Sequence, residues 1–307
     1  LAVAFWCLPA LYSYVHSAFM RLLNGEDGDT AQLCTEGQEW SSHRKERCIA
    51  AAEDALQLTR IMLVISADCY SAWNARRAVF THRLVMATTD ESVTVSLFQE
   101  ELNTVDLVLS RHPKSAETWG MRKWLVGLQE WTLYFNASAD HARREAAVCD
   151  SVSHRYPRNY YAWNYRIGLL ENGFLSGTLS EELESNRKWI QKHVGDHCAY
   201  HYRQHLLVRM CASLAGGEGK EETTTTGQLW QQEMHFVSGL IEFFPGHEAM
   251  WAHRRAVAKH CLWHEANVAA SAPTGEESVK YSPPATLEEL LAIVREPTVY
   301  PGDGVEE

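Results

Sequence analysis

The sequence predicts an all-α fold, an α-α superhelix (solenoid) of tandem helical hairpins. Two observations predict this fold. First, a tryptophan or tyrosine followed three positions later by arginine occurs five times, at steps of 46, 44, 37 and 51 residues. Second, amphipathic segments separate these phrases, and no sustained polar and apolar alternation predicts strands. Repeats that each bury one face against the next are typical of solenoids.

The composition is that of an ordinary globular protein rather than a disordered or membrane-spanning one. Of the 307 residues, 46% are hydrophobic and 22% are charged, and the formal net charge is -11. This acidic balance argues against a nucleic acid as the main partner. The eight cysteines include no CxxC pair, which indicates reduced thiols and a cytoplasmic protein.

The first twenty residues contain no Asp, Glu, Lys or Arg. A signal peptide or membrane span is one interpretation, but Pro9, Ser13 and His16 argue against it. The apolar residues follow helical spacing, as in a helix that packs on a core; they are Leu8, Leu11, Tyr12, Val15 and Phe19. We therefore expect a buried helix here and no membrane span.

Each aromatic and arginine phrase is expected to open the second helix of a hairpin. Proline six positions before the aromatic, and Ser, Asn or Asp four positions before it, are signals for the start of a helix. Residues three apart share one face, so the aromatic ring can pack on the preceding hairpin while the arginine reaches carbonyls or carboxylates. The five pairs, which we interpret as repeat and interface residues, are Trp73 with Arg76, Trp119 with Arg122, Trp163 with Arg166, Tyr200 with Arg203, and Trp251 with Arg254.

The segments between the phrases predict the first helices of the hairpins, at residues 93–110, 139–156 and 179–194. We expect a repeat domain over residues 1–265, interrupted by a polar, flexible loop at 215–227. Residues 266–307 are rich in proline and end in acidic residues. They are expected to form a largely disordered tail with one short helix at 287–294.

Four histidines at steps of four, His193, His197, His201 and His205, could form a metal ladder if they shared one helix. A turn predicted at Gly195 separates the first of them from the rest. No cysteine or carboxylate nearby completes a zinc site, so we expect imidazoles that pack on a helix face and no metal in this chain. His260 and His264 have the same interpretation.

Three phrases, PKSAETWGMRKW, YPRNYYAWNYRI and FPGHEAMWAHRR, resemble the repeat of the protein prenyltransferase α-subunit family. The resemblance runs from about residue 5 to residue 265. The phrases HVGDHCAYHYRQHLL and PGHEAMWAHRR are most similar to the branch that forms the α-like half of a type III geranylgeranyltransferase.

The resemblance implies the α-type subunit of a heterodimeric enzyme, inactive alone, that supports a β subunit of the Rab geranylgeranyltransferase type. The β subunit would hold the zinc ion and the isoprenoid, so no cofactor is expected in this chain. The complex would transfer a geranylgeranyl group from its diphosphate to a C-terminal cysteine of a protein such as a SNARE.

The resemblance also implies candidate site residues. Lys114 matches a family lysine that reaches the diphosphate, and Asn159 with Tyr160 matches a pair that lines the substrate cleft. Two positions depart from the family: Tyr161 replaces a histidine and Ala116 replaces a tyrosine.

One alternative function is a non-catalytic helical-repeat scaffold that binds peptides or partner proteins. Steps of 37 to 51 residues argue against the tetratricopeptide type of scaffold, whose repeat is about 34 residues.

Overall fold

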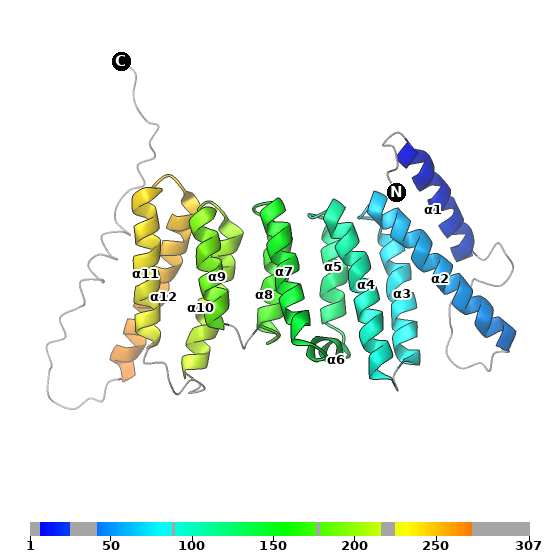
Figure 1. Ribbon diagram of the computed structural model, residues 1–307. Coiled ribbons are helices and arrows are strands. Elements are labelled where there is room, and N and C mark those ends of the chain that lie inside the picture. The colour runs from blue at the N-terminus through cyan, green and yellow to red at the C-terminus, as the bar shows by residue number, and fades with distance from the viewer. Residues whose placement is uncertain (1–6, 25–41, 88–89, 176–178, 216–224, 272–307) are drawn as a thin grey trace, which may run out of the picture. The chain divides into compact units, whose positions relative to one another are not determined.

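The structure is a computed structural model that describes residues 7–24, 42–87, 90–175, 179–215 and 225–271. Over these residues it contains twelve helices and no strands. The helices are α1 (Leu8–Asn24), α2 (Ser42–Ile65), α3 (Tyr70–Met86), α4 (Glu91–Arg111), α5 (Ala116–Val126), α6 (Trp131–Asn136), α7 (Ala139–Arg155), α8 (Tyr160–Glu171), α9 (Leu179–Lys192), α10 (His197–Ala215), α11 (Thr226–Phe243) and α12 (Glu248–Ser271) (Figure 1).

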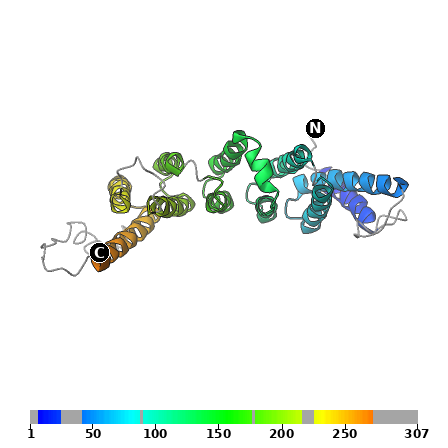
Figure 2. The same cartoon turned by 90° about the horizontal axis from the view of Figure 1, so that it is seen from below.

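The contacts divide the chain into two compact units, Leu1–Leu179 and Ser180–Glu307. In the first unit α1 packs on α2, and the hairpins α2–α3, α4–α5 and α7–α8 follow one another. The view in Figure 2 shows the green helices of this unit nearly end-on, because neighbouring helices run side by side. In the second unit, α10 packs against both helices of the hairpin α11–α12. This succession of hairpins confirms the predicted all-α repeat fold.

The second helices of the hairpins begin where the sequence signals predict. The Ser115 side chain caps α5 by accepting a hydrogen bond from the Thr118 amide at 3.2 Å. Asn159 caps α8 in the same way, accepting from the amide of Tyr161 at 3.2 Å. Such caps satisfy amide groups that have no partner inside the helix. The first helices α4, α7 and α9 also match their predicted segments within two residues at each end.

The N-cap residues also connect neighbouring hairpins of the first unit. Ser115 donates to the Asp68 carboxylate at 2.7 Å, and the Asn159 side-chain amide donates to the Pro113 carbonyl at 2.8 Å. Each of these bonds joins one interhelical turn to the turn of the preceding hairpin. The turns at 66–69, 112–115 and 156–159 therefore lie along one edge, which we call the turn edge; it is at the upper ends of α3, α5 and α8 in Figure 1.

The short helix α6 was not predicted, and aromatic packing holds it at the other end of the first unit. Trp131 and Tyr134 are fully buried, and their ring centroids lie 5.6 and 5.7 Å from that of Phe98 on α4. These distances are typical of favourable aromatic pairs. As a result α6 packs against both α4 and α7.

The N-terminal helix α1 has the predicted buried face, because Val15 and Phe19 are only 3% and 0% exposed. Among the described helices, none has the length and apolar content that a bilayer crossing requires. The expected loop at 215–227 lies largely outside the described residues, and so does the short helix expected at 287–294. Helix α12 continues to Ser271, beyond the expected domain limit at residue 265, and the predicted domain limits stay predictions.

Candidate functional site

The tryptophan of the repeated phrase fixes the turn that precedes its helix. The Nε1 atoms of Trp73, Trp119 and Trp251 each donate to the carbonyl six residues earlier, at 2.8, 2.9 and 2.8 Å. The first two indoles are no more than 1% exposed. Each indole thus satisfies its single donor, and the apolar bodies of Trp73 and Trp119 fill the core.

The arginine of the phrase joins successive repeats. Arg76 on α3 forms a two-pronged ion pair with Glu101 on α4, with both nitrogen to oxygen distances at 2.7 Å. Arg122 on α5 pairs with Glu145 on α7 at 2.9 and 2.8 Å. In the second unit, Arg203 on α10 pairs with a glutamate on α11, Glu233, at 2.7 Å through both nitrogens.

All these side chains are at most 5% exposed. A guanidinium that faces a carboxylate with two parallel hydrogen bonds is the strongest geometry for such a pair. We call each such contact a joint and number the joints by repeat. The carboxylates lie in the middle of the first helix of the following hairpin.

The remaining guanidinium nitrogen, Nη1, divides the joints into two kinds. In the first and fourth joints it donates to a main-chain carbonyl of its own hairpin, Leu56 for Arg76 and Leu183 for Arg203, both at 2.9 Å. We call these carbonyl joints.

In the second joint, Nη1 donates instead to an aspartate of its own hairpin, and the phrase arginine of the third repeat makes the same contact. Arg122 donates to Asp106, and Arg166 donates to Asp150. The second joint extends further, because Arg144 on α7 also donates to the Asp106 carboxylate at 2.8 Å. We call these carboxylate joints.

Two of the joint glutamates, Glu145 and Glu233, have a second partner, which lies two positions after the aromatic of their own repeat. The hydroxyl of Tyr165 donates to Glu145 at 2.6 Å, and in the fifth repeat His253 Nε2 lies 2.7 Å from Glu233. Burial and the adjacent carboxylate raise the pKa of Tyr165 well above its ordinary value, so its hydroxyl stays protonated and donates. Burial raises the pKa of Glu233, but the hydrogen bonds from His253 and Arg203 outweigh burial and lower this pKa to about 2.

The sequence reasoning missed these carboxylates, although the sequence contains a signal for them. A glutamate stands 18 residues before the repeat aromatic in four of the five repeats; these are Glu101, Glu145, Glu182 and Glu233. All four are buried. In the fourth repeat, Glu182 accepts from the hydroxyl of Tyr202 at 2.6 Å, which is the equivalent of the Tyr165 contact.

The fifth pair differs from the others. Arg254 is half-buried and lies over the ring of its own Trp251, with the guanidinium carbon 5.7 Å from the ring centroid. This contact is within the range of a cation–π interaction. The fourth aromatic, Tyr200, is 2% exposed and its ring centroid lies 5.1 Å from that of His253. The third, Trp163, is 3% exposed.

The predicted site residues Lys114, Asn159, Tyr160 and Tyr161 all lie on the turn edge. Lys114 is exposed and directly follows Pro113, whose carbonyl accepts from Asn159. The Asn159 side chain itself is fully buried, so it acts on this edge by holding the turn.

The two tyrosines differ in exposure. Tyr160 is 57% exposed, whereas Tyr161 is half-buried and packs edge-on against it, with ring centroids 5.7 Å apart. The structure therefore presents Lys114 and Tyr160 from two turns that are bonded to each other. Their roles at a substrate cleft stay predictions, as does the effect of Ala116, which is exposed at the start of α5.

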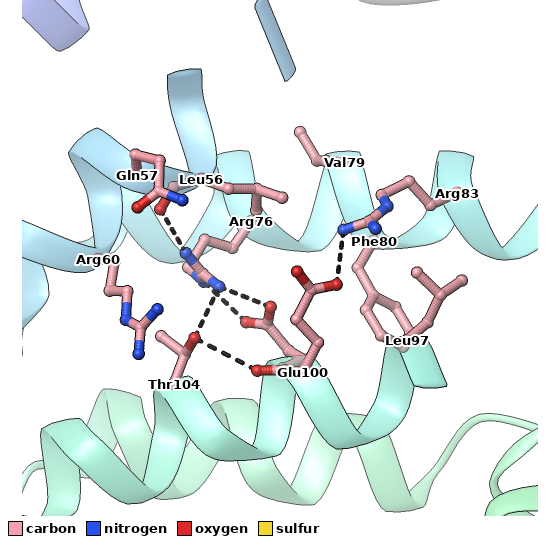
Figure 3. Close-up of a pocket in the computed structure, with 11 residues that line it drawn as sticks. Leu56, Gln57, Arg60, Arg76, Val79, Phe80, Arg83, Leu97, Glu100 and Thr104 are labelled. Carbon is pink, nitrogen blue, oxygen red and sulfur yellow. Dashed lines mark hydrogen bonds and ion pairs between the residues drawn. The ribbon is translucent and has the colours of Figure 1, made fainter. Parts of the chain in front are cut away.

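A small cavity of about 40 Å³ lies beside the first joint, between α2, α3 and α4 (Figure 3). The ion pair of Arg76 and Glu101 forms part of its lining, together with Thr104. At its rim, Arg83 pairs with Glu100 at 3.0 Å. We call this space the first-joint cavity.

The histidine ladder is interrupted, as expected from the turn at Gly195. His193 follows the last residue of α9, and its ring stacks on Trp189 with centroids 4.0 Å apart. On α10, His201 and His205 contact each other edge to face at 4.9 Å. Within the described part of the chain, no three His, Cys, Asp or Glu side chains come together as a metal site would require. The side chain of His264 lies outside the described residues.

Comparison with known families identifies five repeats in the chain. The protein prenyltransferase alpha subunit repeat matches residues 52–83, 98–129, 142–173, 179–210 and 230–261. Together these stretches cover just over half of the 307 residues. Each stretch contains one aromatic and arginine phrase, so the joints belong to the matched pattern.

Several curated proteins are similar over most of the chain. Protein prenyltransferase alpha subunit repeat-containing protein 1 of Danio rerio is 29% identical over 303 residues, which cover 86% of this chain and 63% of the relative. The Homo sapiens protein of the same name is 27% identical over 298 residues, covering 84% of this chain and 66% of the relative.

A more distant relative is geranylgeranyl transferase type-2 subunit alpha 2 of Arabidopsis thaliana. It is 27% identical over 227 residues, which cover 70% of this chain and 31% of the relative. The chain thus spans a little under two thirds of the length of the first two relatives and about a third of this one.

Proposed function

The chain belongs to the family built from protein prenyltransferase alpha subunit repeats, and we propose that it is the α-type subunit of a heterodimeric protein prenyltransferase. The proposed partner is a β subunit of the Rab geranylgeranyltransferase type, which would hold the zinc ion and the isoprenoid. The proposed substrate is a cytoplasmic protein with a C-terminal cysteine, such as a SNARE. The similarity to a geranylgeranyl transferase alpha subunit supports the choice of isoprenoid.

The observation that carries this proposal is the geometry around Lys114. The Pro113 carbonyl accepts hydrogen bonds from both Trp119 and Asn159, so the main chain beside Lys114 is held from two hairpins. The ammonium group therefore extends into solvent from a rigid base. A charge held in place before the reaction stabilises a transition state better than a mobile one.

The proposed reaction needs a cation at this place. The cysteine sulfur, as a thiolate, forms a bond to the first carbon of the isoprenoid while the bond from that carbon to the diphosphate oxygen breaks. The diphosphate leaves with the electron pair, and negative charge grows on its oxygens. In this proposal Lys114 lies beside those oxygens and stabilises the charge, and a zinc ion held by the partner would lower the pKa of the thiol.

Assembly is the first test. We expect the chain mixed with a Rab geranylgeranyltransferase β subunit to elute from size-exclusion chromatography as one 1:1 complex, measured by light scattering. The complex should transfer a labelled geranylgeranyl group to a SNARE with a C-terminal cysteine. Two separate peaks would contradict the proposal. Binding without transfer would favour the non-catalytic scaffold.

Substitution of Lys114 is the second test. In the assembled complex, Lys114→Ala should lower the single-turnover rate by about tenfold to a hundredfold, because an oriented cation near the leaving group is lost. Complex formation should be unchanged, because the side chain is exposed. Lys123→Ala, at an exposed lysine later on α5, is the matched control. Equal rates for the two variants would remove Lys114 from the mechanism.

A further inference from the structure

The first four repeats can be compared position by position, because the same residue spacing recurs in each. One position stands 13 residues before the repeat aromatic, on the first helix of each hairpin. It is occupied by Arg60, Asp106, Asp150 and Arg187 in the first four repeats. In the carboxylate joints this residue is the aspartate that accepts from the phrase arginine. In the carbonyl joints it is an arginine.

The arginine of the fourth repeat has a partner in its own joint. The guanidinium carbon of Arg187 lies 4.6 Å from the ring centroid of Phe236, and that of Arg203 lies 4.7 Å from the same ring. Phe236 stands three residues after the joint glutamate on α11. Its ring therefore occupies the space beside the joint and provides the π face for both cations.

The first joint lacks this ring, which accounts for the first-joint cavity. The residue three positions after Glu101 is Thr104, whose small side chain leaves the space beside Arg76 unfilled. Arg60 lies at this space and is exposed. The two carboxylates of the lining are paired with other arginines, Glu100 with Arg83 and Glu101 with Arg76 (Figure 3). Over the described residues, the Arg60 guanidinium has no hydrogen bond or ion pair.

We propose that the first-joint cavity is a docking site for a carboxylate side chain of the β-type partner, which binds Arg60. This inference rests on the proposed function. Charge is the first reason, since Arg60 contributes a cation that no described acidic side chain neutralises. The neighbouring repeats give the second reason. The position that Arg60 occupies in the first repeat holds a carboxylate in the second and third, Asp106 and Asp150.

Size also favours a carboxylate. The cavity of about 40 Å³ has room for about three water-sized atoms, which is the number of heavy atoms in a carboxylate group. The walls suit the rest of such a side chain, because Leu56, Val79 and Phe80 present apolar surface to its methylene groups. The planar fork of an arginine then matches the two carboxylate oxygens.

The test uses the complete chain with the β-type subunit. Arg60→Asp places in the first joint the residue that the second joint already carries, so we expect the melting temperature of the free chain not to fall. The affinity for the β subunit should fall by about tenfold or more, since a charged hydrogen bond is replaced by repulsion. Arg143→Asp, on the exposed surface of α7, makes the same change in charge and should leave the affinity unchanged.

Chemical modification of the wild-type chain decides the question without a variant. Butanedione, which reacts with free guanidinium groups, should modify Arg60 in the free chain and much more slowly in the complex, as measured by peptide mass mapping. Arg143 should react equally in both. A wild-type complex in which Arg60 reacts as fast as in the free chain would overturn the docking site and leave the proposed function standing. Failure of the wild-type chain to bind the β subunit would overturn both.

Discussion

Substitution of Glu145 by alanine should destabilise the first unit strongly. Glu145 is fully buried and accepts three hydrogen bonds, from Nε and Nη2 of Arg122 and from the hydroxyl of Tyr165. Its removal leaves the guanidinium, which is 0% exposed, with Asp106 as its remaining acidic partner in the joint. The tyrosine hydroxyl loses its acceptor as well.

The magnitude follows from burial. Removal of one partner from a buried ion pair costs about 3–5 kcal/mol, because the other charge stays out of water without compensation. The free energy of unfolding of a typical domain is roughly 5–15 kcal/mol, so this loss is a large part of it. Arrays of repeats can unfold in parts, so the effect should be greatest in α5 and α7.

Amide hydrogen exchange measures this local effect. In Glu145→Ala, the slowest amides of α5 and α7 should exchange about two to four orders of magnitude faster than in the wild type, since each 1.4 kcal/mol, roughly, is a factor of ten. Arg143→Ala removes an ion pair that is about 80% exposed and should change exchange by less than about tenfold.

A double variant distinguishes the cost of an unpaired buried charge from the cost of lost packing. Arg122→Met with Glu145→Leu removes both charges and fills the space, so it should cost far less than the single variant. The reasoning is refuted if Glu145→Ala exchanges no faster than Arg143→Ala.

Two further predictions concern acid stability and the turn edge. The folded pKa of Glu233, about 2, lies below its ordinary value of 4.5, so its pairing stabilises the fold above about pH 4.5 and is lost as the pH falls toward 2. Glu233→Gln should therefore show a weaker dependence of unfolding free energy on pH between 5 and 2.5, and an unchanged dependence in urea titrations would contradict this. Asn159→Ala removes the cap of α8 and the bond to Pro113, and it should lower the melting temperature by about 2–8 °C, for a loss of about 1–2 kcal/mol. Asn164, which is half-buried, takes part in neither contact, and Asn164→Ala is the control.

The helices were predictable because their signals are local. Caps such as Ser115 and Asn159 and the apolar spacing of the first helices require only neighbouring residues, and the structure places the helices there. The helix α6 has no such signal. Its six residues follow Gly127 without a side-chain cap, and tertiary packing of Trp131 against Phe98 determines it.

The joints were only half predictable. The sequence indicated that each arginine would find a carbonyl or a carboxylate, but it could not select which one, because the partners lie 23 to 30 residues away on another hairpin. Likewise, residue type did not reveal that the Asn159 amide points inward, since a polar side chain that caps a helix can be buried when its hydrogen bonds are satisfied.

The shared pairing rule of the joints makes the hairpins interchangeable in principle. In the three joints that pair an arginine with a glutamate, Arg76, Arg122 and Arg203 each meet the glutamate at the same place on the next hairpin. Excision of one whole hairpin, from a point before α4 to the matching point before α7, would bring Arg76 opposite Glu145 and recreate a joint. Gain or loss of entire repeats is therefore a route by which chains of this type can change length during evolution without a new set of contacts.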